Sequence, residues 1–164
     1  MRLSRIKRSE LIGFAGAAIL LGSLWLPWFS TSCKAHGGPA GCNVNSAIHG
    51  MHGTFNAFQT YSILRWLLVA AAVAPFILAW IIARGHELSW RPGEVTMVVG
   101  LAAFVLILAN GIILGRPGGN GHTNVGISIE VGYFVAMLGA LLIAIGGFVR
   151  QAKAIRSRKP PGVM

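Results

Sequence analysis

Four apolar runs of membrane-spanning length are the feature that most constrains how this chain can fold. An α-helix needs roughly 20 apolar residues to cross the hydrocarbon core of a bilayer. None of these runs carries an Asp, Glu, Lys or His in its middle. The sequence therefore predicts four transmembrane helices, at about residues 11–29, 63–83, 95–114 and 131–149.

The balance of charge favours lipid over water as the solvent. Charged residues make up only 11% of the 164, whereas soluble domains carry about a quarter. The net charge of +10 would suit nucleic acid, but the basic residues flank the apolar runs, so we expect no nucleic-acid partner. Residues 1–164 should form a single all-α membrane domain. We expect a four-transmembrane-helix bundle with a structured extracellular loop between its first two helices.

The distribution of Lys and Arg predicts an orientation, because cytoplasmic loops are enriched in basic residues. Of the 14 Lys and Arg residues, four precede the first run, two lie between the second and third runs, and five lie in the tail 150–164. Only Lys34, Arg65 and Arg116 fall elsewhere. We therefore expect a multi-pass protein of the cell (plasma or inner) membrane, with both termini in the cytoplasm and an outer loop over residues 30–62.

Glycines in the later runs indicate close helix packing. Gly111 and Gly115 form a GxxxG motif, and Gly132, Gly139 and Gly146 recur every seven residues on roughly one helix face. Such a stripe lets another backbone approach. We favour packing within the bundle over a contact between subunits.

The outer loop holds the only two cysteines, Cys33 and Cys42. An even cysteine count on the oxidising side of a membrane favours a disulfide between them. On the chain-entropy model such a short loop would contribute about 2–3 kcal/mol. Free thiols are the remaining alternative.

A metal site is the competing interpretation of this loop. Three histidines accompany the cysteines, and tetrahedral zinc accepts mixed Cys/His ligands. The spacing matches no standard ligand pattern, because no CxxC is present and Gly50 and Gly53 weaken a helix that would place His49 and His52 on one face. The candidate ligands are Cys33, His36, Cys42, His49 and His52.

The end of the outer loop is predicted to anchor the second helix at the membrane surface. Asn56 with Gln59 three residues later resembles a helix capping box. Phe55, Phe58 and Tyr61 recur at helical spacing, and aromatic rings of this kind favour the headgroup level.

Arg65 and Glu130 are the charges closest to the hydrocarbon on the outer side. A lone charge at that depth is costly, so we expect pairing or snorkelling. Both residues fall near the same leaflet, which predicts an Arg65–Glu130 ion pair, with Arg116 as the competing partner of Glu130.

The cytoplasmic tail is predicted to contact anionic lipid headgroups, at about 1 kcal/mol per basic residue near the surface. Holding the last helix end inside would also explain its charge. The five residues are Arg150, Lys153, Arg156, Arg158 and Lys159.

Catalytic and cofactor motifs are missing from the sequence. No histidine lies at membrane depth for haem, no acid lies mid-span for ion coupling, and one widely spaced cysteine pair cannot relay electrons. P-loops, HExxH motifs and nucleophile elbows are also missing. We therefore expect no catalytic residue, no cofactor and no enzymatic activity.

Two resemblances follow from these residues. The segments 24–29 (LWLPWF) and 56–58 (NAF), with the glycine-rich last run, resemble an uncharacterised class of small bacterial four-span membrane proteins. That resemblance implies topology and no activity. Cys33, Cys42 and Arg65 are similar in arrangement to the claudin-type superfamily, although its Gly-Leu-Trp element is missing. This likeness implies a stapled outer loop and lateral assembly.

The sequence thus favours a membrane protein that acts through contacts. We expect an accessory or assembly subunit of a membrane complex, or a self-assembling unit, with the bilayer and other subunits or itself as partners. The alternatives are a metal- or redox-responsive outer-loop protein and a small channel or transporter. The acid-free spans disfavour transport.

Overall fold

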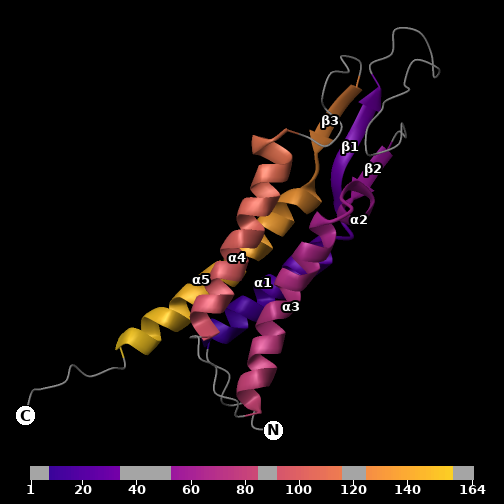
Figure 1. Cartoon of the computed structure of the whole chain (residues 1–164). Coiled ribbons are helices and arrows are strands. Elements are labelled where there is room, and N and C mark those ends of the chain that lie inside the picture. Colours follow the sequence, from indigo (N-terminus) through magenta and orange to yellow (C-terminus); the bar gives the residue numbers. More distant parts are fainter. Residues whose placement is uncertain (1–7, 34–52, 85–91, 116–124, 157–164) are drawn as a thin grey trace, which may run out of the picture.

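The structure is a computed structural model that describes residues 8–33, 53–84, 92–115 and 125–156. It is mostly helical, with a small antiparallel sheet beyond one end of the helices (Figure 1). The helices are α1 (Arg8–Ser23), α2 (Ala57–Thr60), α3 (Leu64–Ala83), α4 (Pro92–Leu108) and α5 (Val131–Arg156), and a π-helical segment, η3 (Ala109–Ile113), continues α4. The strands are β1 (Pro27–Cys33), β2 (Gly53–Asn56) and β3 (Val125–Ile129).

Within the described residues, three helices are long and apolar enough to cross a membrane, which confirms that the chain has helices of membrane-spanning length. They are Leu64–Ala83, Gly93–Ile113 and Val131–Ala152. Large apolar side chains cover their outward faces, as lipid would require. The exposed side chains include Phe76, Ile77, Val98, Leu101, Val105, Phe134, Leu138 and Phe148.

The first predicted span is shorter than expected, because α1 ends at Ser23 rather than near Phe29. The indole Nε1 of Trp28 donates to the Ser23 carbonyl at 2.8 Å. A side-chain donor at this point satisfies a carbonyl that a helix end leaves open. The chain then turns and enters β1 at Pro27, a residue that could not have donated a helical hydrogen bond.

The sheet overturns the all-α prediction. Its strand order is β2-β1-β3, and both pairings are antiparallel. In the central strand, Phe29 pairs with Phe55 on one side and Ile129 on the other, while Thr31 pairs with Ile127. β1 and β3 are nearly 100 residues apart in sequence, so only the fold brings them together.

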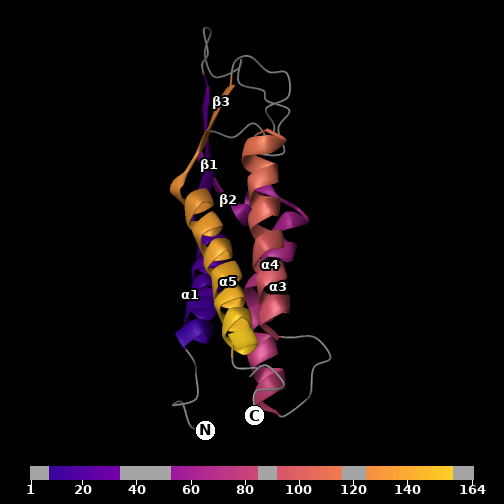
Figure 2. The same cartoon turned by 90° about the vertical axis from the view of Figure 1, so that its left-hand side faces the viewer.

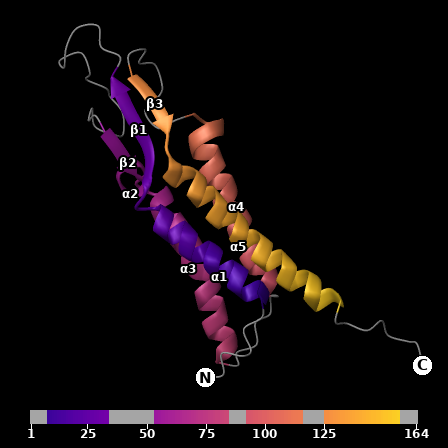
Figure 3. The ribbon, with the colours of Figure 1, turned by 180° about the vertical axis from the view of Figure 1, so that it is seen from behind.

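Helix α5 contacts both α1 and α4, and α3 contacts α1 and α4 as well (Figures 2 and 3). Glycines set the close approaches. A Cβ on Gly139 would lie 2.6 Å from Leu20 N and 2.9 Å from the Gly16 carbonyl of α1. A Cβ on Gly147 would lie 2.3 Å from Met97 N of α4. Backbone-to-backbone contact therefore holds α5 against both neighbours.

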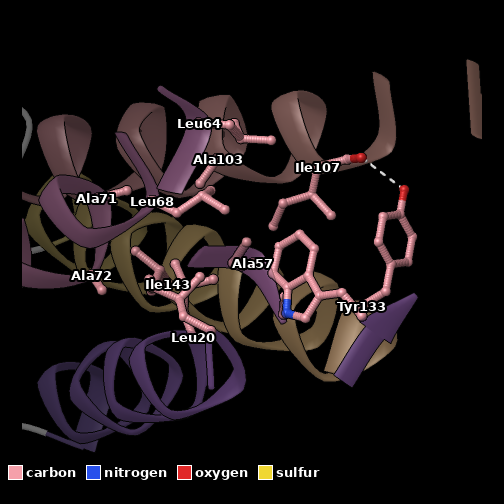
Figure 4. Packing of buried hydrophobic residues seen from close by; sticks show 14 of the residues in the cluster. Leu20, Ala57, Leu64, Leu68, Ala71, Ala72, Ala103, Ile107, Tyr133 and Ile143 are labelled. Atoms are coloured by element: carbon pink, nitrogen blue, oxygen red, sulfur yellow. Dashed lines mark hydrogen bonds between the residues drawn. The ribbon is translucent and has the colours of Figure 1, made fainter. Parts of the chain in front are cut away.

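The core runs between the helices and continues up to the sheet. Leu20, Leu68, Ile107 and Ile143 are completely or almost completely buried between α1, α3, α4 and α5 (Figure 4). Asn56 and Gln59 form the predicted capping box: Gln59 N donates to Asn56 Oδ1 at 3.0 Å, and Asn56 N donates to Gln59 Oε1 at 3.1 Å. This cap starts α2, which links the sheet to α3.

Candidate functional site at the junction of helices and sheet

Four aromatic side chains join the helices to the sheet, and we call them the junction: Trp28, Phe29, Tyr61 and Tyr133. The Trp28 and Phe29 rings lie 5.7 and 5.9 Å from the Tyr133 ring, and each lies 6.1 Å from the Tyr61 ring. Trp28, Phe29 and Tyr133 are completely buried. Tilted and edge-to-face contacts at these distances are favourable beyond the area that they bury. The junction therefore fixes β1 on the helices.

The two tyrosine hydroxyls of the junction bind the π-helical end of α4. Tyr133 donates to the Ile107 carbonyl at 2.7 Å (Figure 4), and Tyr61 donates to the Asn110 carbonyl. The Leu114 N–H donates to the Ala109 carbonyl at 2.8 Å, which is the i→i+5 pattern of a π-helix. In an α-helix this N–H would donate to the Asn110 carbonyl, which therefore lacks its usual donor. Tyr61 supplies the missing donor. Side chains from other elements thus stabilise the widened turn.

Gly111 makes room for this arrangement. A Cβ on Gly111 would lie 2.3 Å from Cε2 of the Tyr133 ring. The GxxxG motif predicts Gly111 as a helix-packing residue, but it predicts neither a tyrosine partner nor a π-helical segment. A glycine facing an aromatic across helices leaves no signal in one sequence.

Burial raises the pKa of the Tyr61 hydroxyl, with a further contribution from the nearby Tyr133. The group lies between α2 and α3, at the edge of the helical region. A raised pKa keeps the hydroxyl protonated, and only the protonated hydroxyl can donate to the Asn110 carbonyl. The contact is therefore retained across the physiological pH range.

The predicted Arg65–Glu130 ion pair is not among the ion pairs of the described residues, because each side chain has a nearer partner. Ser30 Oγ donates to Glu130 Oε1 at 2.5 Å. Arg65 Nη1 donates to the Phe58 carbonyl at 2.6 Å, and its guanidinium lies 5.5 Å from the Trp66 ring. Glu130 thus strengthens the pairing of β1 with the segment that enters α5, and Arg65 fixes α2 on α3.

An ion pair lies at the opposite end of the helices. Arg150 Nη2 is 3.3 Å from Glu10 Oε1, and both side chains are about a quarter exposed, at 25% and 22%. Beside the pair is a cavity of roughly 20 Å³, enough for about one water molecule. It is lined by Glu10, Gly13, Phe14, Pro75, Thr96, Gly146, Gly147 and Arg150. Arg150, predicted to contact lipid, therefore also ties α5 to α1.

The predicted outer-loop site falls mostly outside the described residues. Cys33 ends β1, while Cys42, His36, His49 and His52 lie outside, so the disulfide and the metal site stay predictions. The parts of the chain that the structure describes contain no group of three metal-ligating side chains. Lys153 and Arg156 belong to the last turns of α5, and Arg158 and Lys159 lie beyond the description.

The predicted packing glycines lie against other segments of the same chain. Gly132 approaches the Pro27 carbonyl, Gly139 approaches α1, and Gly146 lines the cavity. Gly115 follows η3 with φ +91°, a conformation that favours glycine, and a Cβ there would meet nothing within 4 Å. The GxxxG pair therefore has one packing glycine and one turn glycine.

Comparison with known proteins yields no family. No protein-family model matches the chain, and no curated protein is significantly similar to it in sequence. The geometry of the junction and of the sheet that it supports is therefore the basis for the function proposed below.

Proposed function

We propose that this protein is a non-enzymatic, multi-pass protein of the cell membrane that presents its sheet outside as a rigid platform for contacts with other membrane-protein subunits or with itself. One observation carries the proposal. β1 follows α1 and β3 precedes α5 after short connections, and α1 and α5 touch backbone to backbone at Gly16 and Gly139. A sheet built on two helices that are in direct backbone contact keeps a fixed orientation.

Free strand edges support a role in contacts. Among the described residues, β2 and β3 each pair only with the central strand β1. Edge strands present unpaired N–H and C=O groups on which another chain can add a strand. Thr54 on β2 and Ser128 on β3 are exposed. The likeness to the claudin-type superfamily, which implies lateral assembly, agrees with this role.

The membrane placement in this proposal has four spans and cytoplasmic termini. The 16 residues of α1 are about 24 Å long at ~1.5 Å per residue, so the turn and the start of β1 would complete the first crossing. Most basic residues then lie on the cytoplasmic side, at the end of the helices opposite the sheet. The basic tail would contact anionic headgroups there.

Site-specific photo-crosslinking in native membranes tests the proposal. A benzophenone amino acid is placed at Thr54 or Ser128, with Ile77 as the control because it is 53% exposed on the apolar part of α3. We expect one discrete protein adduct, with the same protein identified from both sheet positions, and lipid adducts from Ile77. Absence of protein adducts at both sheet positions, with a monodisperse monomer in mild detergent, would contradict the platform.

A further inference from the structure

Helix α3 carries an arginine close to a tryptophan ring at each end. The guanidinium carbon of Arg65 lies 5.5 Å from the centre of the Trp66 ring, and that of Arg84 lies 4.5 Å from the centre of the Trp80 ring. The two arginines are separated by about 28 Å along the axis at ~1.5 Å per residue, close to the ~30 Å of a bilayer's hydrocarbon core. When α3 spans the membrane, both guanidinium groups therefore lie at headgroup depth.

The two arginines differ in how firmly they are held. Arg65 is partly buried, and its Nη1 donates to the Phe58 carbonyl at 2.6 Å. Its Nε is buried and has no hydrogen-bond partner. Arg84 is exposed at the last turn of α3. The guanidinium of Arg65 is therefore pre-positioned by a hydrogen bond to the main chain, whereas Arg84 is exposed and packs on the Trp80 ring.

A row of aromatic rings begins beside Arg65 with the Trp66 ring. The Trp25 ring lies 5.1 Å from the Phe58 ring, which lies 6.3 Å from the Trp66 ring. Trp25 and Trp66 are 61% and 60% exposed. We call Trp25, Phe58 and Trp66 the aromatic patch. They come from the turn after α1, from α2 and from α3, so the fold assembles the patch from separate segments beside one cation.

The charge of Arg65 has no carboxylate partner among the described residues, because Glu130 binds Ser30 and Glu10 binds Arg150. The N-terminus of α3 has no side-chain cap, so its first N–H groups add partial positive charge at the same place. A guanidinium has five donors in a fork that matches phosphate oxygens. Indole rings favour the headgroup level, with the apolar face toward the acyl chains.

We propose that Arg65 and the aromatic patch bind an anionic glycerophospholipid in the outer leaflet. The guanidinium of Arg65 binds the lipid phosphate, and the acyl chains lie along the exposed face of α3. The inference rests on the proposed transmembrane placement of α3 and is separate from the partner-binding role of the sheet. Arg84, by contrast, makes only a general contact with the inner headgroup layer.

Native mass spectrometry of the full-length protein, titrated with phosphatidylglycerol, tests this site. Arg65→Gln should weaken the tightest lipid-binding step by about tenfold, the loss expected when one charge-assisted contact to phosphate is removed. The matched control Arg84→Gln removes the same charge from the same helix and should change that step by less than about twofold. Equal effects of the two variants, or no effect of Arg65→Gln, would overturn the proposal.

A second measurement on the unmodified protein keeps the test valid when Arg65→Gln fails to fold. Phosphatidylglycerol added to detergent micelles should raise the Tm more than phosphatidylcholine, and inorganic phosphate should not reproduce the rise. Equal stabilisation by both lipids, or by inorganic phosphate, would overturn the site. Failure of the Thr54 and Ser128 crosslinks would instead contradict the platform and leave this result unaffected.

Discussion

Tyr133 on α5 donates a hydrogen bond to the main-chain carbonyl of Ile107 on α4, 2.7 Å away and two residues before the π-helical segment begins at Ala109. The ring of the same residue packs edge-to-face on Trp28 of β1 at 5.7 Å. One buried side chain of α5 thus contacts both a neighbouring helix and the central strand of the sheet. The orientation of the sheet depends on this contact.

Removing the hydroxyl by Tyr133→Phe should destabilise the protein by about 1–3 kcal/mol, because a buried carbonyl loses its donor. Thermal unfolding in detergent measures the loss as a lower Tm. The control is Phe148→Leu on the same helix, which is 60% exposed and should change the Tm little. Equal Tm values for Tyr133→Phe and the unmodified protein would show that the hydroxyl does not hold η3.

Enlarging the α1–α5 contact by Gly139→Ala should lower stability by about 1–3 kcal/mol or more, because the new methyl would lie 2.6 Å from Leu20 N and backbone cannot move aside cheaply. Gly22→Ala is the matched control, since a Cβ there meets nothing within 4 Å. That variant should be neutral or slightly stabilising. A stable Gly139→Ala protein would contradict the close approach of α1 and α5.

The raised pKa of Tyr61 predicts a pH dependence at the alkaline end. Its unfolded pKa is about 10, and the folded pKa is higher, so the folded state holds the proton more tightly. The stability contributed is fully present below about pH 10 and is lost as the pH rises toward the folded pKa. The free energy of unfolding, measured from pH 8 to pH 11, should fall toward the alkaline end. Tyr61→Phe should make this pH dependence shallower. An equally steep profile in Tyr61→Phe would rule out Tyr61 as its source.

The Glu10–Arg150 pair should contribute modestly, because both side chains are about a quarter exposed and solvent screens them. A double-mutant cycle with Glu10→Gln and Arg150→Gln is expected to give a coupling free energy of about 0.5–1 kcal/mol that falls with added salt. A coupling free energy of zero at low salt would mean that the pair does not fasten α5 to α1.

The sequence predicted the parts of this fold that depend on local pattern. Hydropathy located α3, α4 and α5, and the spacing of Asn56 and Gln59 identified the cap of α2. The sheet was missed because the pairing of Phe29 with Ile129 joins segments 100 positions apart. β3 alternates apolar residues with Gly126 and Ser128, but its partner β1 (PWFSTSC) shows no alternation, so the pairing left no matching pattern in the sequence.

The partners of the charged side chains could not be predicted for a related reason. Arg65 binds the carbonyl of Phe58, seven positions earlier, rather than the remote carboxylate of Glu130. Charge patterns identify ionic partners, but a main-chain carbonyl is present at every residue and has no sequence signature. Which carbonyl Arg65 reaches depends on the turn between α2 and α3, and only the structure defines that turn.

The most direct test of the central claim is the side of the membrane on which the sheet lies. In a Cys33→Ser, Cys42→Ser background, Thr54→Cys places a single thiol at an exposed position of β2, and Arg84→Cys places one at the C-cap of α3. A membrane-impermeant maleimide applied to intact cells should label Thr54→Cys, and should label Arg84→Cys only after permeabilisation. Labelling of Arg84→Cys in intact cells, with Thr54→Cys protected, would place the sheet in the cytoplasm and contradict an outer platform.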